Sequence, residues 1–209
     1  MHTYIFDFDH TMFNTNAMRA AFQMELLKHC GVTAEQYKTA EAVATANGAL
    51  YSLEAHISAL SVDMDTQERV RAVAESIVQR MSEWVYPDVL PALDVLRAKK
   101  ARLILLSFGN HDWQTLKIAH SGLIDFFDVI EIVEGSKTEP VHLFESEEGG
   151  QISCINDRSS EINELFQAFP HVTYDWITRE HTPYNQVPPT VPHRQISSFS
   201  EITATVPVD

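Results

Sequence analysis

Near its start this chain of 209 residues reads Tyr4-Ile5-Phe6-Asp7-Phe8-Asp9-His10-Thr11. The apolar residues predict a buried strand over residues 4–8. Asp7 and Asp9 stand two positions apart, so both carboxylates point the same way from the sheet. Like charges held this close repel and raise each other's pKa. A divalent cation between them, or one protonated carboxyl beside an ionised one, accounts for the pair, and so does a solvated strand end.

The composition limits the classes of partner. A hydrophobic fraction of 44% and few Gly and Pro predict a globular protein with one sizeable core, or one core plus a small inserted domain. The net charge of −14 disfavours nucleic acid and anionic membranes, because no basic footprint is present. No apolar run approaches the roughly 20 residues that a membrane span requires.

Two observations predict a cytoplasmic protein. Cys30 and Cys154 lie far apart and fit no metal or redox spacing, so we expect reduced, buried thiols. The acidic motif follows the first residues so closely that no secretory signal is expected.

Five short apolar runs predict the strands of a parallel sheet covered by helices on both faces. They span residues 4–8, 103–106, 129–133, 152–155 and 172–177. The Pro-rich segment 183–192 is expected to be an irregular surface loop.

Residues 14–86 contain no convincing strand and interrupt this succession of strands, which predicts a helical insertion after the first strand. Apolar residues recur there at helical spacing, Gly31 is a plausible helix stop, and residues 65–68 resemble a helix start. We therefore expect a core domain of residues 1–13 plus 87–209 and a helical cap domain of residues 14–86.

Polar side chains follow four of the predicted strands. Ligands of open parallel sheets bind at the carboxyl ends of the strands. The residues there are Asp7 and Asp9, then Ser107, Phe108 and Gly109, then Lys137, and finally Asp157 with Glu161 four positions on. Carboxylates suit Mg²⁺, and a lysine, a hydroxyl and backbone N–H groups suit phosphoryl oxygens. The set favours phosphoryl transfer, with one carboxylate as nucleophile and another as acid and base.

In this order and spacing the residues resemble the four motifs of the haloacid dehalogenase superfamily, in particular its phosphatase-type members. The resemblance covers nearly the whole chain. It implies a doubly wound α/β core with a strand order similar to 5-4-1-2-3 and an inserted helical cap. It also implies a Mg²⁺-dependent phosphatase that hydrolyses a small phosphorylated metabolite, with the protein a monomer or a homodimer.

Carried over by position, the resemblance implies a role for each motif residue. Asp7 is the expected nucleophile and Asp9 the general acid and base, with Ser107 and Lys137 completing the catalytic set. Phosphate binding is expected from Thr11, Ser107, Phe108, Gly109 and Lys137. The expected metal site comprises Asp7, the Asp9 main-chain carbonyl and Asp157, with Glu161 as a direct or outer ligand.

Two positions depart from the pattern, since His10 and Asn156 stand where glycine is usual. Two other functions also stay open. A phosphomutase would keep Asp9 but must exclude water from the aspartyl-phosphate. A non-catalytic binding protein of the same fold is disfavoured by the intact motif residues. A dehalogenase needs neither a metal nor a second aspartate, so Asp9 and Asp157 argue against it.

Overall fold

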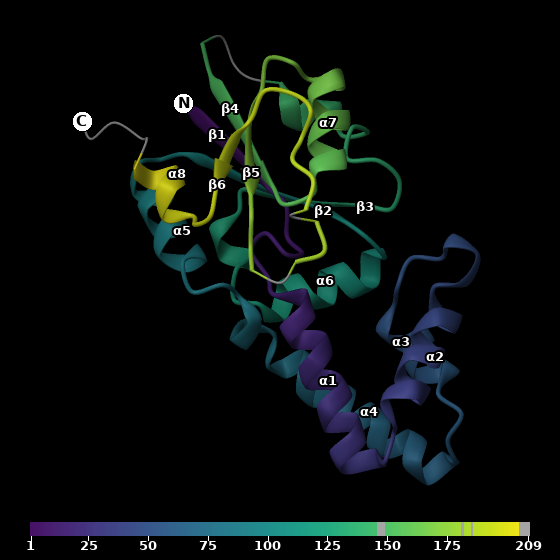
Figure 1. The fold of residues 1–209 in the computed structure, drawn as a ribbon. Helices are drawn as coiled ribbons and strands as arrows, with labels where there is room; N and C mark the ends of the chain where they lie inside the picture. The colour runs from purple at the N-terminus through teal and green to yellow at the C-terminus, as the bar shows by residue number, and fades with distance from the viewer. Residues whose placement is uncertain (146–148, 181, 185, 205–209) are drawn as a thin grey trace. The chain divides into compact units, whose positions relative to one another are not determined.

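The computed structural model of the protein describes residues 1–145, 149–180, 182–184 and 186–204 (Figure 1). The described residues form two compact units. One comprises Met1–Asn14, Val85–Phe108 and the described residues from Leu123 onward, and the other comprises Thr15–Trp84 and Gly109–Gly122. We call them the sheet unit and the helical unit. The domain boundaries expected from sequence stay a prediction.

A single sheet of six parallel strands organises the sheet unit, in the order β3-β2-β1-β4-β5-β6. The strands are β1 His2–Phe6, β2 Arg102–Phe108, β3 Val129–Val133, β4 Gln151–Asn156, β5 Thr173–Ile177 and β6 Arg194–Ile196. At its centre Ile5 lies opposite Ile104 on β2 and Cys154 on β4, and all three side chains are buried. The predicted α/β class, the five strands and their order are confirmed.

β6 was not predicted from the sequence, and β1 was predicted to continue two residues beyond its end at Phe6. β6 has only three residues and pairs with β5, where Arg194 donates two hydrogen bonds of 2.7 and 2.6 Å to the Asp175 carboxylate. β1 ends at Phe6, so Asp7 and Asp9 follow the strand instead of lying on it. An edge strand this short has no sequence period of its own and depends on its neighbour.

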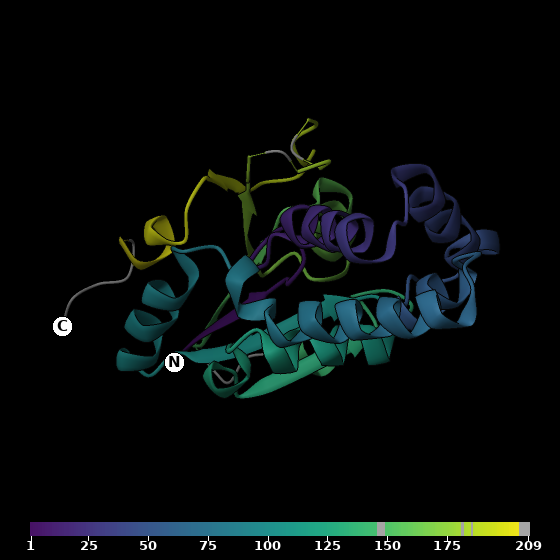
Figure 2. The ribbon, with the colours of Figure 1, turned by 90° about the horizontal axis from the view of Figure 1, so that it is seen from below.

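Helices flank the sheet in this unit. They are α5 Val89–Ala98, α7 Ser159–Ala168 and α8 Ser200–Ala204, with 3₁₀ turns η3 Ile124–Phe126 and η4 Val141–Phe144. α7 packs on β4 and β5, and α8 packs on α5 (Figures 1 and 2). Ile162 and Leu165 carry the buried face of α7.

The helical unit contains α1 Thr15–Cys30, α2 Ala34–Ala44, α3 Leu53–Ala59, α4 Met64–Gln79 and α6 His111–His120, with turns η1 Ala46–Gly48 and η2 Met81–Trp84. The predicted helical insertion after β1 is confirmed. α1 runs alongside α4 (Figure 2), and its buried residues are Met18, Phe22 and Leu26. No helix in the described part of the chain has the length and hydropathy of a membrane span.

Two helix ends in this unit have clear causes. Gly31 follows α1 with φ +70°, a conformation that glycine adopts without strain, so the predicted stop is correct. The expected start of α4 at residues 65–68 is two residues late. Asp63 caps the helix by accepting a hydrogen bond of 2.7 Å from the Thr66 N–H.

Candidate active site

The parallel sheet brings the predicted residues to one edge. Asp7 follows β1, Ser107 and Phe108 end β2, Lys137 lies in the loop after β3, and Asp157 follows β4. Leu105 pairs with Phe6, so Ser107 stands two residues beyond the end of β1. The carboxyl ends of parallel strands all face the same way, so residues 130 positions apart become neighbours.

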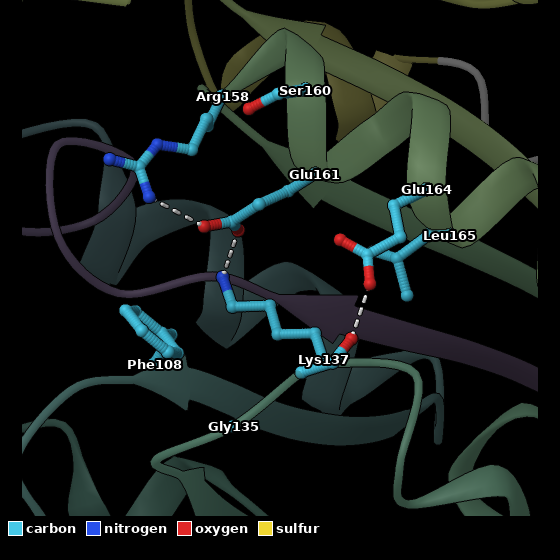
Figure 3. Close-up of a pocket in the computed structure, with 9 residues that line it drawn as sticks. Phe108, Gly135, Lys137, Arg158, Ser160, Glu161, Glu164 and Leu165 are labelled. Carbon is cyan, nitrogen blue, oxygen red and sulfur yellow. Dashed lines mark hydrogen bonds and ion pairs between the residues drawn. The ribbon is translucent and has the colours of Figure 1, made fainter.

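A buried ammonium group joins two of the carboxylates. Lys137 Nζ donates to Asp7 Oδ1 at 2.5 Å and lies 2.6 Å from Glu161 Oε2. Figure 3 shows this Lys137 amine and the guanidinium of Arg158 both directed toward Glu161, which α7 carries. Burial alone lowers the pKa of Lys137, but Asp7 and Glu161 outweigh it and raise that pKa, so the lysine stays charged.

Glu161 is held by cations and an amide. Besides Lys137, it accepts 2.8 Å from Asn156 Nδ2 and 3.2 Å from Arg158 Nη1. Burial raises the pKa of Glu161, but Lys137 and these donors outweigh burial and lower that pKa. Its contacts are therefore those of a group that orients Lys137. Its expected role as a direct metal ligand stays a prediction.

Asn156 has an evident task at its non-glycine position. Its Oδ1 accepts a hydrogen bond of 2.8 Å from the Arg158 N–H, while its Nδ2 donates to Glu161. The side chain therefore ties the turn after β4 to α7. A glycine could supply neither contact, so this departure from the family pattern adds support to the site.

Asp157 is buried, and one of its oxygens is satisfied only weakly. Thr11 Oγ1 donates to Asp157 Oδ1 at 3.4 Å, while Asp157 Oδ2 is buried with no hydrogen-bond partner among the described residues. Burial, then the charge of Asp7, raises the pKa of Asp157 to about 8. A buried oxygen without a donor is a place where a cation fits.

The charge balance also fits a cation. Asp7 and Asp157 are buried and Glu161 is mostly buried, against the buried Lys137 and the half-buried Arg158. Burial raises the pKa of Asp7, and Lys137 opposes that rise. In the described residues, no group of three or more His, Cys, Asp and Glu is arranged to hold a metal by itself. Mg²⁺ needs fewer, since it keeps several waters beside one or two carboxylates.

Ser107 and its neighbours form the phosphate-binding candidates. The Ser107 hydroxyl is buried and has no hydrogen-bond partner in the described part of the chain. Phe108 lines a cavity of about 350 Å³ together with Lys137 and Arg158 (Figure 3). Gly109 begins the second segment of the helical unit with φ +149°, so a residue with a Cβ is strained there, and that Cβ would also meet Gln114 Nε2 at 2.5 Å.

Asp9 and His10 lie in the loop after β1. Asp9 is partly exposed and forms an isolated bridge with Phe13. His10 has φ +60°, in the left-handed region that favours glycine but that His adopts more readily than most residues. Its ring packs edge-on against Tyr184 at 5.8 Å. The positive φ explains why glycine suits this position.

Three residues around the site, Arg158, Trp176 and Arg179, were not predicted from the sequence. Arg158 donates 2.7 Å to the Tyr184 hydroxyl and lies over the Tyr184 ring at 4.2 Å. Trp176 Nε1 donates 2.8 Å to the Asp157 carbonyl, and Arg179 donates to the Thr11 carbonyl. Arg158 could have been found in the sequence, because it directly follows Asp157. No local sequence pattern marks Trp176 or Arg179.

Together the parallel sheet, the helical insertion after β1 and the buried carboxylate–lysine cluster define a doubly wound α/β protein with a charged site at the carboxyl ends of its strands. A family model described as haloacid dehalogenase-like hydrolase matches residues 4–143, and the chain belongs to this family. No curated protein sequence matches the chain significantly.

Solved structures share the fold at low identity. A putative haloacid dehalogenase-like hydrolase from Burkholderia xenovorans LB400 has a TM-score of 0.77 at 18% identity, covering 98% of this chain and 95% of that one. The putative hydrolase YfnB from Bacillus subtilis, bound to magnesium, has a TM-score of 0.65 at 18% identity and 97% coverage of both chains. The L-2-haloacid dehalogenase from Xanthobacter autotrophicus has a TM-score of 0.59 at 14% identity, covering 97% and 96%. The fold thus occurs in a dehalogenase as well as in a magnesium-bound hydrolase.

Proposed function

We propose that this protein is a Mg²⁺-dependent phosphatase of small phosphorylated metabolites. The observation that carries the proposal is the buried pair of Asp7 and Lys137, within a cluster that is short of positive charge. A nucleophilic carboxylate held by an ammonium group is suited to attack a phosphoryl group whose own charge needs neutralising. The magnesium-bound relative from B. subtilis supports the choice of metal.

The chemistry follows from the residues at the sheet edge. An oxygen of Asp7 attacks phosphorus, the bond to the ester oxygen breaks, and Asp9 gives its proton to the leaving alkoxide. Asp9 then takes a proton from water as that water attacks phosphorus, which releases inorganic phosphate and restores Asp7. Ser107 and Lys137 hydrogen-bond the transferring group, together with Thr11 and the backbone at Phe108 and Gly109.

Asp7, Asp157 and the Asp9 carbonyl would hold Mg²⁺, which supplies positive charge for the phosphoryl oxygens when bound. The buried Asp157 Oδ2, which has no hydrogen-bond partner among the residues that the structure describes, supports this assignment. Glu161 would not contact the metal but would orient Lys137 through their ion pair. A dehalogenase has no use for a metal at Asp157 or for a second aspartate at position 9, so these residues favour the phosphatase.

The test is turnover of p-nitrophenyl phosphate with and without Mg²⁺. We expect Mg²⁺-dependent release of phosphate by the wild type and at least a 1,000-fold loss in Asp7→Asn, an order of magnitude typical for removal of a nucleophile. Asp94→Asn, an exposed change on α5, is the matched control and should keep full activity. Phosphate release that persists in Asp7→Asn, or no turnover by the wild type on a broad panel of phosphate esters, would exclude the proposal.

A further inference from the structure

Arg179 is a buried arginine that no part of the proposed chemistry uses. It lies two residues after β5, and its side chain is 7% exposed. Its Nε and Nη2 both donate to the main-chain carbonyl of Thr11, at 3.2 and 3.0 Å. Its Nη1 donates to Asp88 Oδ2 at 2.8 Å. One guanidinium therefore connects the loop after β1 to the residue that precedes α5.

The far end of this connection is fixed by several groups. Asp88 Oδ2 also accepts hydrogen bonds from the Phe199 N–H at 2.8 Å and from Ser198 Oγ at 3.0 Å. The guanidinium lies 4.2 Å from the Tyr86 ring centroid and 5.3 Å from that of Phe199. The aromatic faces and the Asp88 carboxylate, whose Oδ2 accepts all three of these hydrogen bonds, hold the arginine in one orientation.

At its other end the connection reaches Thr11, which contacts the proposed metal ligand Asp157. Thr11 is completely buried, and its hydroxyl donates to Asp157. The loop is closed by hydrogen bonds from the Met12 and Phe13 N–H groups to the Phe8 carbonyl, at 2.9 and 3.0 Å. A shift of the Thr11 carbonyl would therefore move the segment that carries Asp9.

We propose that Arg179 is a positioning residue that holds the loop of residues 8–13 in its working geometry. It acts through the Thr11 carbonyl and sets where Asp9 and Thr11 lie relative to Asp157. The inference rests on the proposed function, in which these groups bind Mg²⁺ and transfer the proton. The planar fork matters as much as the charge, because a lysine ammonium can be placed at the carbonyl or at Asp88 but cannot reproduce all three hydrogen bonds.

The experiment compares Arg179→Gln and Arg179→Lys with Arg194→Gln. Arg194 is the matched control, since it also joins a carboxylate and a main-chain carbonyl in the sheet unit, but these belong to Asp175 and Glu201 and not to residues 8–13. Each variant is assayed for kcat and KM on p-nitrophenyl phosphate. Mg²⁺ affinity is measured separately, from the rise in Tm across a series of Mg²⁺ concentrations, because a ligand of the native state stabilises it by RT ln(1 + [L]/Kd).

We expect Arg179→Gln to lower kcat at least 10-fold with less than a 3-fold change in KM, and to weaken Mg²⁺ affinity several-fold. Arg179→Lys should lie between it and the wild type, and it is the deciding variant if Arg179→Gln does not fold. Arg194→Gln should lower Tm but leave kcat and Mg²⁺ affinity unchanged. Equal losses in the Arg194 and Arg179 variants, or wild-type kcat and Mg²⁺ affinity in a folded Arg179 variant, would overturn the proposal.

Failure of the proposed function gives a different result. A wild type without phosphatase turnover but with Mg²⁺-dependent stabilisation that Arg179→Gln weakens would reject the phosphatase and support the positioning role. A wild type with neither turnover nor stabilisation by Mg²⁺ would overturn both.

Discussion

Lys137 donates a hydrogen bond of 2.5 Å to Asp7, although 130 positions separate the two residues in the chain. The same ammonium lies 2.6 Å from Glu161, so one buried cation balances two carboxylates. Removing one partner of a buried ion pair leaves an uncompensated charge, which is more damaging than the loss of the pair itself.

We therefore expect Lys137→Met to abolish activity and to destabilise the protein by about 3–5 kcal/mol, the usual scale for breaking a buried pair. Urea unfolding of the variant beside wild type measures the loss. Lys38→Met, at an exposed position on α2, is the control and should unfold like wild type. A fully stable Lys137→Met protein would contradict the buried charge pair.

Glu161 and Asp157 are predicted to respond differently to loss of charge. Glu161 contacts Lys137, Asn156 and Arg158, so Glu161→Gln should lower kcat about 10-fold, the effect of an outer residue on a site, with little change in the Mg²⁺ requirement. Asp157→Asn should instead raise the Mg²⁺ concentration needed for half-maximal activity by more than 10-fold. Titration of both variants with Mg²⁺ measures this concentration. A large increase in Glu161→Gln would show that Glu161 is a direct metal ligand.

The strand ends could be predicted from sequence because their physical cause is local. Short apolar runs ending in polar residues give strands, and a parallel sheet then gathers Asp7, Ser107, Lys137 and Asp157 whatever their separation in the chain. The start of α4 was predicted less accurately, because residues 65–68 were expected to begin the helix, whereas Asp63 caps it through the Thr66 N–H.

The supporting contacts could not be predicted in this way. Arg179 reaches Thr11 across 168 positions through a loop that has no period, so only the packed structure brings them together. On α6 the apolar Leu116 is 36% exposed, while Lys117 is buried with its ammonium 5.7 Å from the Trp113 ring centroid. A pattern of apolar residues cannot anticipate a buried lysine that an aromatic ring accommodates.

Ser107→Ala is predicted to separate activity from stability. The Ser107 hydroxyl is buried without a hydrogen-bond partner in the described residues, so its removal breaks no hydrogen bond of the free protein. A buried polar group left unsatisfied is unfavourable, and we expect Tm to stay equal or to rise slightly. The hydroxyl gains its partner when the phosphoryl group is transferred, so kcat should fall about 10- to 100-fold, near the scale for one donor to a transition state.

The control for this experiment is Ser153→Ala on β4, whose hydroxyl lies 2.8 Å from Thr173 Oγ1 and 2.9 Å from His2 Nε2. This change should lower Tm and leave kcat unaltered. A Ser107→Ala variant with normal kcat would remove Ser107 from the catalytic set.

The Asp88 carboxylate predicts a pH dependence of stability. Burial raises its pKa, but hydrogen bonds from Arg179, the Phe199 N–H and Ser198 outweigh burial and lower that pKa on folding. Between the folded and unfolded pKa values the unfolded state binds more protons, so this contribution is complete above about pH 4 and disappears as the pH falls through the folded value.

The measurement is urea unfolding of wild type and Asp88→Asn from pH 3 to pH 7. The stability difference should be constant at pH 5–7 and should shrink at the acid end. A difference that stays the same at pH 3 would show that the Asp88 charge contributes nothing to stability.

His10 is the position where backbone and side chain can be tested apart. Its φ of +60° is unfavourable for any residue with a Cβ, by about 1–2 kcal/mol, whereas glycine adopts it freely. His10→Gly therefore removes the ring contact with Tyr184 but relieves the backbone, and His10→Ala removes the same ring without that relief. We expect His10→Gly to be about 1 kcal/mol more stable than His10→Ala, within the range for a left-handed residue.

Activity then assigns the role of the imidazole. If the ring only packs beside Tyr184, His10→Gly keeps kcat within a few-fold of wild type, since the loop retains its conformation. If the ring contacts the leaving group, both variants lose kcat equally, although their stabilities differ. We expect the first result, because His10 is only 7% exposed and its ring already packs against an aromatic partner. Equal, large losses of kcat in the two variants would make His10 part of the catalytic set.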